Sequence, residues 1–112
     1  MPLINVRLSS SQVANAEELL KELSSELANL TGKPESYVMS LLQPGIPMIF
    51  GSSKDPCCYV EVKSIGGLHP HKMTESFCNI INIRTGIPTN RIYIGFEDIP
   101  PSLWGFDKKT FG

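Results

Sequence analysis

The residues best suited to chemistry in this sequence are the first two, Met1 and Pro2. An internal proline nitrogen is an amide without basicity, whereas a proline that begins a chain is a secondary amine. Initiator methionine is removed readily when the next residue is small or is proline, so we expect the mature chain to begin at Pro2. Such an amine works best as a general base when its pKa lies near the working pH. Many cytosolic chains also begin with Met-Pro and have no such chemistry.

The composition describes one small globular domain. The chain has 112 residues, of which 41% are hydrophobic and 19% charged, and its formal net charge is -1. A chain of this length buries about two thirds of its unfolded surface. Without excess positive charge, we expect no nucleic-acid partner and no anionic membrane. The longest apolar runs, such as residues 46–50, are far shorter than the roughly 20 residues that span a bilayer.

The N-terminus does not resemble a signal peptide, because Asn5 and Arg7 interrupt any apolar stretch, and we therefore expect a cytoplasmic protein. Three cysteines, Cys57, Cys58 and Cys78, are too few for a disulfide framework. Neighbouring cysteines in a strand point to opposite faces, so Cys57 and Cys58 would not bridge. We interpret all three as reduced residues.

A pair of histidines, His69 and His71, lacks a third ligand at recognisable spacing. We therefore expect neither a bound metal nor any other cofactor.

The sequence resembles itself at an offset of 54 residues, without gaps. Residues 2–8 align with residues 56–62, and Thr31-Gly32-Lys33-Pro34 aligns with Thr85-Gly86-Ile87-Pro88. A fixed offset of this kind indicates a repeated supersecondary unit. We predict one domain, 1–112, with an internal repeat of two β-α-β copies at residues 2–50 and 56–104.

Local patterns agree with strand, helix and strand in each copy. In the first copy, leucines and other apolar residues recur every three or four positions, which predicts a helix. We take Ser9-Ser10-Ser11 as the cap before this helix, and Gly32 and Pro34 as the residues that end it. The predicted helices are 12–30 and 69–84. The predicted strands are 3–8, 37–42, 57–65 and 91–96, with a short strand at 48–50 and a tail rich in Pro, Trp and Phe.

Right-handed crossovers would join these units into a four-stranded mixed sheet with both helices on one face, a two-layer α+β fold. The strands at 3–8 and 37–42 read as apolar on both sides. The face without helices would therefore need a cover, and identical subunits are the simplest source. We predict a homo-oligomer.

Several short segments resemble the macrophage migration inhibitory factor family, part of the tautomerase superfamily. They include Met1-Pro2, Leu30–Pro34 with Tyr37, Phe50–Ser53 before Pro56-Cys57, Ser64-Ile65-Gly66, Asn90–Ile94 and Thr110-Phe111. The resemblance covers essentially the whole chain. It implies a trimer of duplicated β-α-β units around a central channel, and cofactor-free keto-enol tautomerisation of small aromatic 2-keto acids.

The resemblance also implies roles for individual residues. Pro2 would be the catalytic base, Lys33 would bind the anionic end of the substrate, and the backbone N-H of Ile65, beside Ser64, would contact the substrate. Tyr93 would come from the neighbouring subunit. The apolar pocket walls would be Leu3, Tyr37, Trp104, Phe106 and Phe111.

Each of these residues also has a purely structural interpretation. Lys33 could stabilise a helix C-terminus through its positive charge, an interaction that contributes a few tenths to about 1 kcal/mol to stability. Ser64 and Ile65 could simply end a strand before Gly66-Gly67, and the aromatic residues of the tail could be packing.

The sequence departs from the animal protein of the family in ways that affect specificity. Gly95 replaces an asparagine, Lys63 replaces a histidine, and Trp104-Gly105-Phe106 replaces a valine-glycine-tryptophan order. Val60 occupies the position of the second cysteine of a Cys-x-x-Cys pair, so we expect no thiol oxidoreductase activity.

Three functions remain open on the sequence. The first is a phenylpyruvate tautomerase, with dopachrome as a further substrate class. The second is a cytokine-like ligand, released without a signal peptide, that binds a receptor protein and has an incidental pocket. The third is a superfamily enzyme for another small carboxylic acid, for which only Arg7, Arg84 and Arg91 are available as arginines.

Overall fold

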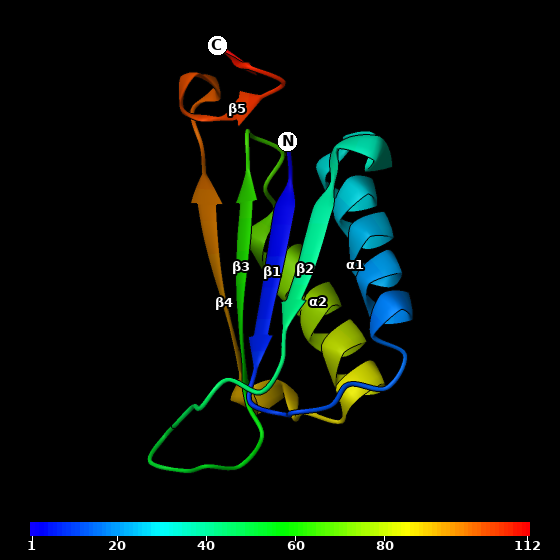
Figure 1. The fold of residues 1–112 in the computed structure, drawn as a ribbon, viewed down its shortest axis with the longest axis vertical. Helices are drawn as coiled ribbons and strands as arrows, with labels where there is room; N and C mark the ends of the chain where they lie inside the picture. The colour runs from blue at the N-terminus through cyan, green and yellow to red at the C-terminus, as the bar shows by residue number, and fades with distance from the viewer.

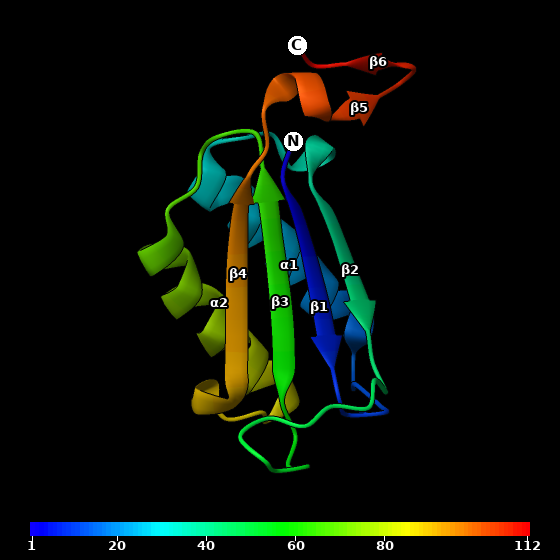
Figure 2. The ribbon, with the colours of Figure 1, turned by 90° about the vertical axis from the view of Figure 1, so that its left-hand side faces the viewer.

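The computed structural model describes all of residues 1–112, and its centre is a four-stranded sheet in the order β2-β1-β3-β4 (Figure 1). β1 pairs parallel with β2 and antiparallel with β3, and β3 pairs parallel with β4. Both helices lie on one face, and the other face is open (Figure 2). The predicted α+β fold is confirmed. The strands are β1 (Leu3–Leu8), β2 (Met39–Gln43), β3 (Cys58–Ser64) and β4 (Ile92–Asp98).

The two helices, α1 (Ala16–Thr31) and α2 (Pro70–Thr85), begin 54 residues apart and end 54 residues apart. Each is followed by a glycine with positive φ, Gly32 at 71° and Gly86 at 78°, the conformation that ends a helix without a Cβ penalty. The helices bury one stripe each against the sheet: Leu19, Leu23 and Leu27 from α1, and Met73, Phe77 and Ile81 from α2. Neither helix combines the length and the apolar character needed to span a bilayer.

The C-terminal segment forms a small hairpin that the sequence did not predict. It follows a 3₁₀ turn, η3 (Pro101–Leu103), and consists of β5 (Gly105–Phe106) and β6 (Lys109–Thr110). The turn residues Asp107 and Lys108 have φ of 49° and 70° without a glycine, so the usual hairpin signal is absent. The hairpin lies over the end of the sheet where the chain begins (Figures 1 and 2).

The predicted helix cap at Ser9–Ser11 was wrong, because these residues are used elsewhere. The Ser9 hydroxyl accepts the N-H of Cys57 at 3.1 Å, and the carbonyl of Ser10 accepts the N-H of Gly45 at 2.8 Å. The segment is thereby held against the loops at the far end of the sheet. The helix begins at Ala16 instead of residue 12, after Asn15 in the left-handed conformation, and without a side-chain cap.

Two predicted strand segments also differ from the structure. Tyr37 belongs to the 3₁₀ turn η1 (Glu35–Tyr37), and β2 starts at Met39. The predicted strand 48–50 has no neighbouring strand to pair with, and its only ladder contact is an isolated bridge between Phe50 and Ser53. A matching 3₁₀ turn, η2 (Thr89–Arg91), precedes β4.

The expectation that the strands are apolar on both sides was wrong for β1. Ile4, Val6 and Leu8 all face the helices and belong to the core, and Asn5 and Arg7 face the other way. Ion pairs cross the open face between Arg7 and Glu61 at 3.2 Å and between Lys63 and Glu97 at 3.9 Å. The open face is apolar at Leu3, Met39 and Leu41, and the rings of Tyr59 and Tyr93 lie on it as well.

Candidate functional site

A cavity of about 270 Å³ lies at the end of the sheet where the chain begins. Pro2, which is buried, forms part of its wall, and the Pro2 carbonyl accepts the N-H of Met39 at 3.1 Å. This bond continues the parallel β1–β2 ladder and fixes Pro2 at the cavity. The lining consists of Met1, Pro2, Leu3, Ser36, Tyr37, Val38, Met39, Trp104, Gly105 and Phe106.

Aromatic rings from two distant segments form one wall of this cavity. The ring of Tyr37 meets the ring of Phe106 edge-on, with centroids 6.1 Å apart and planes at 85°. Phe111 stacks parallel to Phe106 at 5.9 Å, and its N-H donates to the carbonyl of Trp104 at 3.1 Å. Phe111 does not line the cavity, so it acts on the wall by supporting Phe106. An apolar, aromatic wall of this kind suits an aryl group.

The amino group beside this cavity is electrostatically perturbed. Burial lowers the pKa of the Met1 amino group, and the positive charge of Lys33 lowers it further. Lys33 directly follows the glycine that ends α1, and its N-H donates to the carbonyl of Ala28 at 3.2 Å. The end of α1 therefore places a half-buried cation near the start of the chain.

The turn that follows β3 brings a free backbone donor to the same end of the sheet. Ser64 is fully buried, and its hydroxyl donates to the carbonyl of Gly66 at 2.6 Å. The N-H of Ile65 makes no hydrogen bond within the chain. Leu3 pairs with Lys63 in the antiparallel ladder, so one more step along the strands places Ser64 opposite Pro2 and Ile65 opposite Met1.

Gly67 holds this turn against the end of α1, and the contact makes a prediction about stability. A Cβ at Gly67 would lie 2.9 Å from the Thr31 carbonyl oxygen, and φ is +71°, whereas Gly66 has φ of +70° and nothing within 4 Å. We expect Gly66→Ala to cost about 1–2 kcal/mol for the left-handed conformation. Gly67→Ala should lower the free energy of unfolding by about 1–3 kcal/mol more than Gly66→Ala does, because the backbone at Thr31 must move to make room for the Cβ. Denaturant unfolding of both variants measures the difference, and equal midpoints would contradict the contact.

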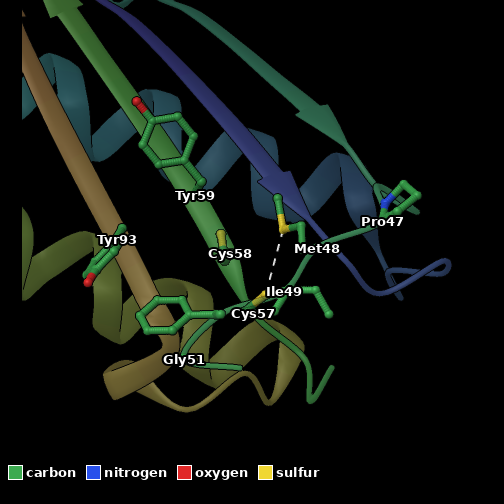
Figure 3. A pocket seen from close by; sticks show the side chains of 9 residues that line it. Pro47, Met48, Ile49, Gly51, Cys57, Cys58, Tyr59 and Tyr93 are labelled. Atoms are coloured by element: carbon green, nitrogen blue, oxygen red, sulfur yellow. Dashed lines mark hydrogen bonds between the residues drawn. The ribbon is translucent and has the colours of Figure 1, made fainter. Parts of the chain in front are cut away.

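Tyr93 lies away from the cavity that contains Pro2. It faces the open side of β4 beside Tyr59 of β3, and 65% of it is exposed (Figure 3). Its ring contacts that of Phe50 at 4.6 Å, in a second cavity of about 550 Å³ that also includes Met48 and Cys57. Within one chain, Tyr93 and Pro2 do not share a site, so the role expected for Tyr93 requires a second subunit.

The three cysteines are free thiols. Cys57 contacts Met48, with the two sulfur atoms 3.7 Å apart (Figure 3). Cys58 faces the core, and burial raises its pKa to about 12, with further contributions from Cys57 and Cys78. A thiol with such a pKa is not a nucleophile near neutral pH. No three or more His, Cys, Asp or Glu side chains come together in a group able to hold a metal ion.

Two substituted positions of the sequence lie on the open face of the sheet. Lys63 pairs with Glu97 and is not part of the cavity lining. Gly95 lies beneath Tyr59, whose hydroxyl oxygen would be 3.5 Å from a Cβ at that position. Sequence reasoning missed Met39 as a cavity residue, although its place after Tyr37 and opposite Leu3 could have indicated it.

The fold and this site define a class of small α+β proteins with two β-α-β units and a cavity at the chain start. A family model described as Macrophage migration inhibitory factor (MIF) matches residues 1–112. The chain belongs to the macrophage migration inhibitory factor family.

Named relatives and solved structures cover nearly the full chain. A macrophage migration inhibitory factor homologue of Brugia malayi is 36% identical over 100% of both chains, and the Xenopus laevis macrophage migration inhibitory factor is 33% identical over 99% of both. The crystal structure of a homologue from Prochlorococcus marinus superposes with a TM-score of 0.95, with 54% identity over 98% of this chain and 99% of that one. The Toxoplasma gondii protein gives a TM-score of 0.89 at 32% identity, over 97% and 99% of the two chains.

Proposed function

We propose that this protein is a keto-enol tautomerase of arylpyruvates, with phenylpyruvate as the representative substrate, and that Pro2 is its base once Met1 has been removed. The family includes tautomerase enzymes. The observation that carries the proposal is the buried Pro2 at an aromatic-walled cavity, next to the Met1 amine, whose pKa is lowered by burial and by the charge of Lys33.

The reaction needs one proton to move twice. In the proposed direction, the neutral Pro2 nitrogen takes a proton from the carbon beside the substrate's carbonyl, and the same proton returns to the carbonyl oxygen to give the enol. No atom is gained or lost. Lys33 and the free N-H of Ile65 are suited to bind the substrate's carboxylate, because both are donors at the same end of the sheet.

The other site residues have supporting roles in this proposal. Leu3, Tyr37, Trp104 and Phe106 hold the aryl ring, and Phe111 supports Phe106 from behind. The Ser64 hydroxyl is engaged with Gly66, so Ser64 shapes the turn and does not bind substrate directly. Turnover of phenylpyruvate by the purified chain, followed by the absorbance of the enol, tests the function, and an inactive processed chain would contradict it.

We further propose that the active protein is a homotrimer in which Tyr93 completes a neighbour's site. Three features support association. Asn5 is 92% buried on the open face with no partner for its Oδ1, Tyr93 is exposed and does not line the cavity that contains Pro2, and structural homologues of the family typically form trimers. In this trimer, the two β-α-β copies at 2–50 and 56–104 would supply the sheet strands that each subunit contributes.

Sedimentation equilibrium measures the assembly directly. We expect a mass three times that of the 12.4 kDa chain at micromolar concentration. A stable monomer under these conditions would refute both the trimer and the role of Tyr93, and it would leave the site to be completed by this chain alone.

A further inference from the structure

The turn between β3 and α2 is fixed by contacts from three directions. The carboxylate oxygen Oδ1 of Asp98 accepts the N-H of Gly66 at 2.9 Å. The Ser64 hydroxyl donates to the Gly66 carbonyl, and the Ser64 carbonyl accepts the N-H of Ile99 at 2.8 Å. Gly67 packs against the Thr31 carbonyl at the end of α1. Residues 64–67 therefore have little freedom, although only Ser64, the last residue of β3, belongs to a regular element.

The N-H of Ile65 lies in the middle of this fixed turn, and the chain leaves it without a hydrogen-bond acceptor, as it does the N-H of Gly67 at the end of the turn. Its neighbours on both sides are held, through Ser64 and Gly66, so its own direction is set by them. The contact of Gly67 with Thr31 also joins the turn to the segment that carries Lys33, two residues further along. A free N-H and a cation thus lie near Met1, which lines the cavity, on two segments that touch, although neither Ile65 nor Lys33 lines the cavity itself.

We propose that Asp98 is a positioning residue for substrate binding: by holding Gly66, it directs the N-H of Ile65 toward the substrate's carboxylate. This inference rests on the proposed function and extends it to a residue at the end of β4 that does not line the cavity. Asp98 carries a negative charge, which repels a carboxylate nearby. Its contribution must therefore come from the geometry of its hydrogen bond and not from its charge.

This distinction gives two variants with opposite expectations. Asp98→Ala removes the acceptor and frees the turn, and we expect the KM for phenylpyruvate to rise about tenfold with kcat within about twofold. The carboxylate keeps its charge through the reaction, so losing a contact to it weakens ground state and transition state alike. Asp98→Asn keeps an acceptor oxygen and removes the repulsion, so its KM should be equal to or lower than that of the unsubstituted protein.

A second readout tests the geometry without turnover. Hydrogen exchange of the Gly66 amide should accelerate in Asp98→Ala and remain slow in Asp98→Asn. Glu97→Ala is the matched control, because Glu97 is adjacent in β4 but pairs with Lys63 on the open face. It should leave both the KM and the Gly66 exchange unchanged.

Three outcomes would overturn the inference: an unchanged KM and unchanged Gly66 exchange in Asp98→Ala, an equal rise in KM for Asp98→Ala and Asp98→Asn, or the same effect in Glu97→Ala. If the unsubstituted protein does not turn over phenylpyruvate, the proposed function fails separately. The dissociation constant for phenylpyruvate, from titration calorimetry, then takes the place of KM in the same comparison.

Discussion

Keeping Met1 in place should lower kcat/KM for phenylpyruvate by about 100- to 10,000-fold, the contribution of a well-placed general base. With Met1 attached, the Pro2 nitrogen is an amide and cannot accept a proton. Residues added ahead of Met1 would block its removal, and intact mass would verify the chain start of each sample. Sedimentation of the same samples shows whether activity falls because the base is lost or because the subunits no longer associate.

Two further forms of the protein sharpen this prediction. Pro2→Ala retains a free but primary amine after processing, so its kcat/KM should fall less than that of the chain with Met1. Pro56→Ala alters the proline that matches Pro2 in the sequence repeat, and it should leave kcat/KM unchanged. Treatment with 3-bromopyruvate should alkylate the Pro2 nitrogen with loss of bromide, and the adduct should be absent when Met1 is retained. A chain that keeps Met1 and retains full activity would exclude the Pro2 amine as the base.

Lys33→Ala should lower kcat/KM about 10- to 100-fold near neutral pH, through two separable effects. The first is a higher KM, because a charge-assisted contact to the carboxylate is lost. The second is a shift of the pH profile. Activity falls as the pH drops through the amine pKa, because the ammonium cannot act as a base. Burial and Lys33 lower the pKa of the Met1 amine, and we expect the charge of Lys33 to act in the same direction on the Pro2 amine once Met1 is gone. Removing Lys33 should then raise the pKa of the Pro2 amine and move the fall in kcat/KM to higher pH.

The controls for Lys33 separate charge from packing. Lys33→Arg keeps the positive charge and should leave the acidic limb of the profile close to its original position. Lys21→Ala removes an exposed lysine from α1 that pairs only with Glu17 and Glu18, and neither the KM nor the pH profile should change. If Lys33→Ala behaves like Lys21→Ala, then Lys33 only stabilises the end of the helix.

The sequence predicted the elements whose patterns repeat along the chain. The stripe of Leu19, Leu23 and Leu27, and the glycines and prolines that end each helix, are local signals of regular structure. The family resemblance pointed to five pocket residues, and the structure brings all five together at one cavity: Pro2, Leu3, Tyr37, Trp104 and Phe106.

What the sequence missed depends on contacts between distant segments. Ser9 reads as a helix cap, but the N-H of Cys57, 48 residues away, uses its hydroxyl. Asp98 has no local motif, because its partner Gly66 comes from another strand end. The hairpin turn at Asp107 and Lys108 lacks glycine, so propensity alone does not indicate it. Tyr93 could be named from resemblance, but the distance between its own cavity and that of Pro2 appears only in three dimensions.

The antiparallel pairing of β1 with β3 relates the two halves of the sheet by an approximate two-fold rotation, which exchanges its two ends. Under this pseudosymmetry, the position equivalent to Pro2 is Pro56, at the opposite end, where the nitrogen is bonded to Asp55 and the carbonyl accepts the Arg91 guanidinium at 3.0 Å. The backbone is therefore nearly symmetric, but the proposed chemistry is not. In the proposed enzyme, only one of the two equivalent ends of the sheet has a basic proline nitrogen, and at the other end the matching nitrogen is an amide.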